Sequence, residues 1–200
     1  MIYRAAWFLS EKISKIIDDE VNIEIYCYGL EIILNSLISI LSVLIIGIII
    51  DRPFCTILYL ISYSVPRLWA GGYHAKTHFR CICFFIIFYL LSLLLIKNGY
   101  IPRNGIIYLL LIDNLLIYRL APVGGAENPI PRKKEYEMKR KATIISITIS
   151  CMIYVISFSS LELAMYGGMG ITWMIVLLAI GKIQFFFMEE KNEEESKQDS

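Results

Sequence analysis

The sequence predicts an all-helical integral membrane protein, with about six transmembrane helices preceded by an N-terminal amphipathic interfacial helix. Hydrophobic residues make up 57% of the 200 residues and charged residues only 18%, a balance far from that of soluble domains. Several apolar runs approach the roughly 20 residues that a helix needs to cross a bilayer. The formal net charge is only +1, the charges cluster between these runs, and no nucleic-acid partner is indicated.

The first 28 residues are predicted to form an interfacial segment. Between Ile2 and Ile17, apolar side chains recur at the spacing of one helix face, while the charged side chains fall elsewhere. Trp7 would then lie near the lipid headgroups. The segment lacks the uninterrupted apolar core and cleavage site of a signal peptide, so we expect it to be retained.

Six apolar segments are predicted to span the membrane within a single polytopic domain, residues 1–188. The spans are expected near residues 30–50, 54–70, 82–96, 105–120, 142–161 and 168–188. The second of them is a full crossing only if the residues after Pro66 continue it past a proline kink. The acidic tail, residues 189–200, has too little apolar content to fold and is expected to be disordered in the cytoplasm.

The distribution of Lys and Arg among the loops predicts the orientation of the chain. With both termini in the cytoplasm, the loops after the second and fourth spans carry most of the cationic side chains on the cytoplasmic side. The outer loops then hold only Arg52, Lys97 and Arg103. A basic run, Arg132 to Lys141, either sets this topology by attraction to anionic lipid or holds an anionic peptide.

One polar stretch, RLWAGGYHAKTHFRCICF, contains both histidines of the chain and two of its five cysteines. A cysteine nucleophile needs a nearby base such as imidazole to take up and return its proton. His78 lies three residues before Cys81, so the two would be neighbours on one helix. His74 lies seven residues before Cys81 and reaches it only if the helix is broken, which Gly71 and Gly72 would allow. The spacing alone leaves both histidines open.

Two other functions are considered from residue types. A zinc or copper site would use the donors His74, His78, Cys81 and Cys83. Their spacing matches no usual zinc pattern, so neither a metal nor another cofactor is expected. A small membrane transporter is the other alternative, because Asp113 and Asn114 lie within the fourth predicted span, where they mark either an ion path or a hydrogen bond between helices.

The stretch RLWAGGYHAKTHFRC resembles the signature of the accessory gene regulator protein B (AgrB) family, the membrane cysteine endopeptidases of peptide quorum sensing. The specific part is the spacing H-x6-C, with the histidine placed as in G-G-x-H-A. A second stretch, APVGGAENPIP, is similar to the family's segment after the fourth span. The resemblance in length and hydropathy covers nearly the whole chain.

The resemblance implies that His74 is the base and Cys81 the nucleophile, rather than His78 and Cys83. Further positions that align with the family, as substrate-binding or site-supporting residues, are Arg67, Gly71 and Gly72. A third catalytic residue or oxyanion donor is expected on mechanistic grounds, and its candidates are Asp113, Asn114, Glu127 and Asn128.

The resemblance also implies the reaction and the partners. The substrate would be a small amphipathic propeptide, whose C-terminal part is removed through an acyl-enzyme thioester before the remainder cyclises to a thiolactone. The protein would lie in the bacterial cell membrane, with its active site on the cytoplasmic side. Besides the propeptide, the lipid bilayer and a second copy of the chain in a homodimer are the candidate partners.

Overall fold

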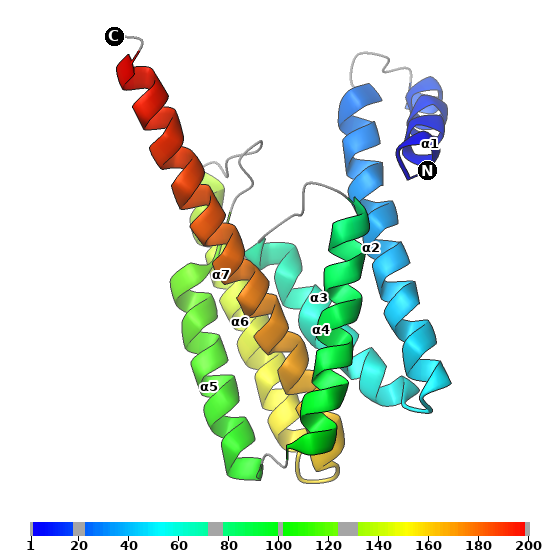
Figure 1. The fold of residues 1–200 in the computed structure, drawn as a ribbon, viewed down its shortest axis with the longest axis vertical. Helices are drawn as coiled ribbons and strands as arrows, with labels where there is room; N and C mark the ends of the chain where they lie inside the picture. The colour runs from blue at the N-terminus through cyan, green and yellow to red at the C-terminus, as the bar shows by residue number, and fades with distance from the viewer. Residues whose placement is uncertain (1, 18–22, 72–77, 100–101, 124–131, 199–200) are drawn as a thin grey trace.

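Seven α-helices and no strand make up the part of the chain that the computed structural model describes, residues 2–17, 23–71, 78–99, 102–123 and 132–198. In chain order they are α1 (Ile2–Ile17), α2 (Ile23–Ile49), α3 (Pro53–Ala70), α4 (His78–Asn98), α5 (Arg103–Leu120), α6 (Arg132–Ile156) and α7 (Leu161–Gln198). Helices α2 to α7 form a bundle, and α1 lies beside the first part of α2 (Figure 1). The predicted all-helical fold is confirmed.

Helix α1 forms over the range that its apolar spacing predicts. It packs against α2 through small side chains four residues apart, Ala6, Ser10 and Ser14, all of which are buried. The other face exposes Tyr3 and Phe8, and the Lys12 ammonium lies 4.6 Å from the centre of the Phe8 ring. An exposed face of aromatic and cationic side chains suits the surface of a membrane.

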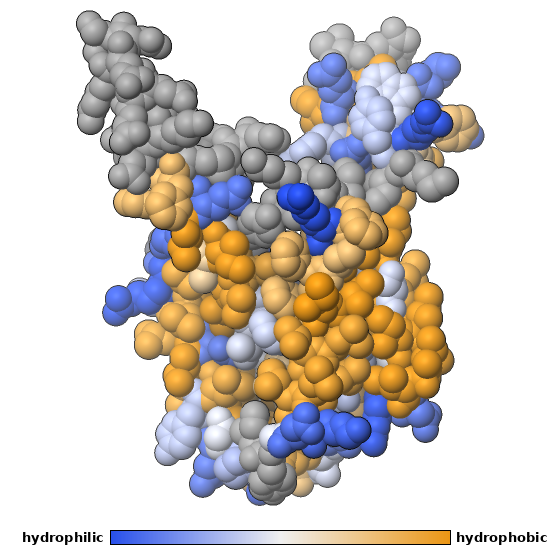
Figure 2. Space-filling view, viewed as in Figure 1, coloured by the Kyte–Doolittle hydropathy of each residue, from blue (hydrophilic) through white to orange (hydrophobic). Residues whose placement is uncertain are grey.

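Helices α2 and α4 present large apolar side chains outward, and a broad hydrophobic band covers the face shown in Figure 2. So much exposed apolar surface requires lipid around it. Among the described residues, the segments long and apolar enough to cross a membrane are Ile23–Ile49, Phe79–Asn98 and Leu161–Gln184. A helical membrane protein is therefore supported, with three helices of this kind among the described residues.

The other three bundle helices are more polar than a typical span. Pro66 and Arg67 interrupt the apolar side chains of α3, although the helix continues past Pro66 to Ala70. Helix α5 is charged at Arg103, Asp113 and Arg119, and α6 begins with the basic run. These helices are tolerated in the bundle because α3 and α5 both pack against α7, and α6 packs against all three. The six-span topology stays a prediction.

Helix α7 is the centre of the bundle and contacts α3, α4, α5 and α6. Most of its apolar part is buried, in contrast to α2 and α4. A Cβ atom at Gly170 would lie 2.5 Å from the backbone oxygen of Tyr59, so glycine is what lets α3 approach this closely. The helix begins before the predicted position 168 and continues to Gln198 through the predicted disordered tail, whose Glu, Lys and Gln residues favour helix.

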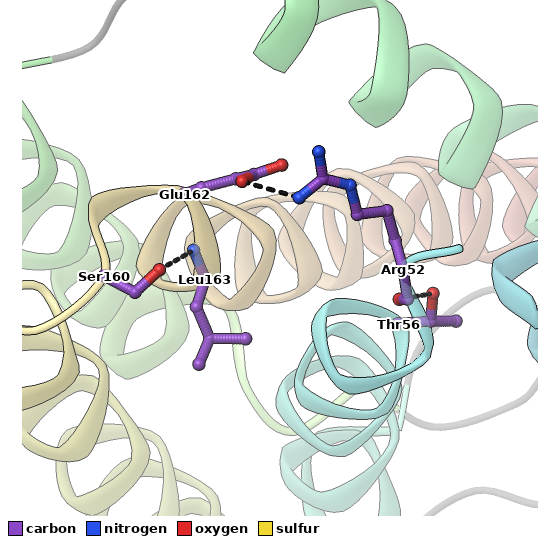
Figure 3. A network of polar contacts seen from close by, with 5 residues as sticks. All are labelled: Arg52, Thr56, Ser160, Glu162 and Leu163. Atoms are coloured by element: carbon purple, nitrogen blue, oxygen red, sulfur yellow. Dashed lines mark hydrogen bonds and ion pairs between the residues drawn. The ribbon is translucent and has the colours of Figure 1, made fainter. Parts of the chain in front are cut away.

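A polar network joins α3 to α7 at the end of the bundle away from α1 (Figures 1 and 3). The Arg52 guanidinium forms an ion pair with Glu162, with 2.9 Å between Nη1 and Oε2. The Thr56 hydroxyl donates to the backbone oxygen of Arg52 at 2.9 Å. Ser160 accepts the Leu163 N–H at 3.3 Å and so caps the start of α7. This network fixes the start of α3 against the start of α7.

Candidate functional site

A backbone contact joins the two stretches that carry the family resemblance. Gly71, which follows α3, pairs with Val123, which follows α5, and the Val123 N–H donates to the Ala70 carbonyl at 2.9 Å. Gly71 has φ of 70°, and a Cβ atom there would lie 2.2 Å from the Val123 oxygen. Only glycine fits this position, both for its backbone conformation and for the close approach. The residues that end α3 and follow α5, far apart in sequence, are thus held together at one end of the bundle.

Several of the predicted site residues lie outside the described residues. They are Gly72, His74, Glu127 and Asn128, and the imidazole of His78 is likewise not described, although its backbone begins α4. The described members of the predicted site are Arg67, Gly71 and Cys81. Arg67 lies in the last turn of α3, next to Gly71, and Cys81 lies in the first turn of α4.

Aromatic side chains pair α3 with α4 in antiparallel order. The rings of Tyr59 and Tyr89 have centroids 5.2 Å apart, and those of Tyr63 and Phe85 are 4.6 Å apart. Moving four residues forward along α3, from Tyr59 to Tyr63, therefore corresponds to moving four residues backward along α4, from Tyr89 to Phe85. Residues four apart share one helix face, so the next pair in this order is Arg67 and Cys81.

Cys81 is a free, half-buried thiol beside a Tyr–Arg pair. The Arg67 guanidinium donates a hydrogen bond to the Tyr63 hydroxyl, and its central carbon lies 5.3 Å from the centre of the Tyr63 ring. The Tyr63 hydroxyl and the Cys81 thiol lie close enough to interact electrostatically. Cys81 therefore lies next to the polar end of the α3 face that carries Tyr63 and Arg67.

Cys83 is also free and half-buried, but it does not share the position of Cys81. Residues two apart on a helix lie on nearly opposite faces, so the two thiols do not converge on one point. Among the described residues, no group of three or more His, Cys, Asp or Glu side chains is placed to hold a metal ion. The two histidines of the predicted four-ligand site lie outside the described side chains.

The basic run packs part of its cationic side chains on aromatic rings near the same end of the bundle. The Lys141 ammonium lies 4.4 Å from the centre of the Trp69 ring, just before Gly71. The Lys139 ammonium lies 4.6 Å from the centre of the Tyr118 ring near the end of α5. These contacts fix the start of α6 against the ends of α3 and α5, which is a structural role for this part of the run.

Asp113 and Asn114 form hydrogen bonds to neighbouring helices. Asp113 accepts the Thr172 hydroxyl of α7 at 2.8 Å, and Asn114 donates to Ser150 of α6 at 2.8 Å. Asp113 lies in the middle of α5, about 10 Å along the helix from its end at Leu120. The hydrogen-bonding interpretation of these two residues is confirmed, and their candidacy as catalytic partners is not supported.

Tyr63 is a site residue that the sequence did not predict. Its signal was present, because a tyrosine four residues before Arg67 lies on the same helix face and can accept from the guanidinium. The sequence could not show that this face of α3 is turned toward α4 near Cys81. Three other aromatic residues, Tyr59, Phe85 and Tyr89, lie nearby on α3 and α4, and residue type alone does not single out Tyr63 among them.

The fold and this site define a class, a helical membrane protein with a half-buried thiol at the end of its bundle, beside a Tyr–Arg pair and a glycine-dependent loop contact. The sequence profile of the accessory gene regulator B family matches residues 4–178. The chain belongs to this family.

Individual relatives agree with that membership. The chain is 27% identical over 165 residues to the putative AgrB-like protein 2 of Clostridium perfringens strain 13, covering 78% of this chain and 77% of the relative. It is 29% identical over 170 residues to accessory gene regulator protein B of Staphylococcus carnosus, covering 82% and 83%. The protein of the same name from Staphylococcus epidermidis is 31% identical over 153 residues, covering 72% and 71%. No solved structure matches the chain significantly.

Proposed function

We propose that this protein is a membrane cysteine endopeptidase that removes the C-terminal part of a quorum-sensing propeptide and promotes cyclisation of the remainder. The observation that carries the proposal is the position of Cys81, which is half-buried and interacts electrostatically with the Tyr63 hydroxyl, itself bonded to Arg67. The Gly71–Val123 contact supports it, because it joins one described residue from each of the two stretches that resemble the family. Family membership supplies the connection to accessory gene regulation.

The reaction follows from thiol chemistry. The Cys81 thiolate attacks the carbonyl carbon of the scissile peptide bond, while His74 holds the thiol proton and returns it to the leaving amine. A C–S bond forms, the C–N bond breaks, and the N-terminal part of the propeptide remains as a thioester on Cys81. A cysteine within that part then attacks the thioester, releasing Cys81 and closing a thiolactone. Exclusion of water favours this transfer over hydrolysis.

The lipid interface is the proposed route by which the substrate reaches the thiol. An amphipathic propeptide concentrates at the membrane surface, and α1 lies at the same end of the molecule as the end of α3 and the start of α4 (Figure 1). The exposed Tyr3 and Phe8 of α1 offer an apolar surface there for a peptide of the same kind. Substrate and enzyme would then meet in the plane of the interface.

Substitution of the reacting residues tests the assignment. Cys81→Ala and His74→Ala should each abolish cleavage of the propeptide by membranes that contain the protein, measured as loss of the C-terminal fragment. The matched controls His78→Ala and Cys83→Ala should retain cleavage, since they remove the same side-chain types from the same segment. Cleavage by the Cys81 variant would refute the proposal. So would stoichiometric zinc or copper in a purified protein that shows no thiol-dependent cleavage.

A further inference from the structure

Attack of a thiolate on a carbonyl places a negative charge on the carbonyl oxygen, and the proposed reaction needs a hydrogen-bond donor for it. Such donors act when they are held 2.7–3.1 Å from the position that the oxyanion takes up, in a site that excludes water. Among the described residues, the Tyr63 hydroxyl lies close enough to the Cys81 thiol to interact with it electrostatically, and this hydroxyl accepts a hydrogen bond from the Arg67 guanidinium.

The Tyr63 hydroxyl has its proton available for a further bond. A phenol has one proton to donate and lone pairs that accept. The Tyr63 oxygen accepts from Arg67, and no acceptor for its own proton is found among the described residues. Bonding to a cation polarises the O–H group, which makes it a stronger donor. Tyr63 is only 5% exposed, so water does not compete for that proton.

The ring of Tyr63 is held rigidly. Its centroid lies 4.6 Å from that of Phe85 on α4, and it stacks on Tyr59 with an interplanar angle of 10°. The Arg67 guanidinium covers it from the last turn of α3. A donor fixed by packing on three sides needs no reorganisation when charge develops, which is the property that makes an oxyanion site effective.

We propose that Tyr63 is an oxyanion donor of this enzyme, with Arg67 as the positioning residue that orients and polarises its hydroxyl. The inference rests on the proposed function, since it assumes that Cys81 is acylated. It assigns to α3 a chemical part in the reaction, in addition to holding the loop contact at Gly71.

Tyr63→Phe tests the proposal, and Tyr59→Phe is its matched control. Both remove a buried tyrosine hydroxyl from the same face of α3, but the Tyr59 hydroxyl has no hydrogen-bond partner among the described residues and lies one turn farther from Cys81. The full chain in detergent micelles is treated with 4-nitrophenyl acetate. The Cys81 sulfur bonds to the acetyl carbon, the ester C–O bond breaks, 4-nitrophenolate leaves, and the thiol proton passes to solvent. Acetylation of Cys81 is followed by peptide mass spectrometry.

A parallel reaction separates oxyanion stabilisation from a structural effect. Iodoacetamide alkylates the same thiol by displacement at a saturated carbon, so no oxyanion forms. Tyr63→Phe should slow acetylation of Cys81 about a hundredfold, the usual loss on removing one oxyanion donor, with the alkylation rate unchanged. Tyr59→Phe should change neither rate. The unchanged alkylation rate also shows that the variant keeps its fold around Cys81.

Two results would overturn the inference, and only the second would also overturn the proposed function. If Cys81 is acetylated faster than Cys83 but Tyr63→Phe leaves that rate unchanged, or lowers both rates together, Tyr63 is not an oxyanion donor and the proposed function stands. If Cys81 in the unaltered protein shows no preference over Cys83 toward the ester, the proposed function fails and the inference fails with it.

Discussion

Position 71 shows how one residue determines whether two distant loops meet. Replacing Gly71 by Ala should destabilise the protein and abolish cleavage, because a side chain at φ of 70° and ψ of −139° costs about 1–3 kcal/mol and its Cβ would also clash with the Val123 oxygen. Thermal unfolding in micelles and the cleavage assay measure the two effects. The control is Gly29→Ala, where a Cβ atom meets no other atom within 4 Å. Full activity of Gly71→Ala would show that the Val123 contact is dispensable.

The sequence identified individual site residues only where they belong to a recognisable motif. The family signature directed attention to Cys81, Arg67 and Gly71, all of which the structure places at one end of the bundle. It gave no indication of Tyr63, because a tyrosine within an apolar helix is indistinguishable from a core residue until its neighbours are known. The contact of Gly71 with Val123 could not be predicted either, because a contact between backbone atoms does not depend on which side chains the two residues carry.

At the scale of helices, the hydrogen bonds of α5 hold it to α6 and α7 rather than provide an ion path. Asp113→Ala and Thr172→Ala should each lower the free energy of unfolding, and the double variant should show a coupling near ~0.6 kcal/mol, typical of hydrogen bonds between membrane helices. Unfolding in mixed micelles gives these values. Propeptide cleavage should persist in all three variants. Loss of cleavage in Asp113→Ala with unchanged stability would instead place this carboxylate in the reaction.

Helix boundaries were predictable where amphipathic spacing or turn residues fixed them, as for α1 and for the start of α3 at Pro53. Composition misled the prediction at the other end of the chain. The acidic residues after 188 have little apolar content, but a helix that is already formed and packed, as α7 is, extends through residues of high helix propensity without a new nucleation cost. Hydropathy also could not show that α7, and not α2, is the central helix, because both are strongly apolar.

The two ends of the helix bundle differ in charge, and the distribution of Lys and Arg predicts that the end with the Gly71–Val123 contact faces the cytoplasm. Single cysteines introduced at exposed positions report on this: Lys134→Cys lies near the start of α6, on the side of the Gly71–Val123 contact, and Asn104→Cys lies at the opposite end of α5. In intact cells, a membrane-impermeant maleimide should label Asn104→Cys and leave Lys134→Cys unlabelled until the cells are opened. The reverse pattern would place the candidate site outside the cell.

The contact between Gly71 and Val123 also bears on how such a protein can diverge. It requires glycine at one position and recognises only main-chain atoms at the other. The side chain at position 123 can therefore be exchanged while the ends of α3 and α5 stay the same distance apart. The join between the two helices is encoded in main-chain atoms, and side chains beside it are free to change without disturbing it.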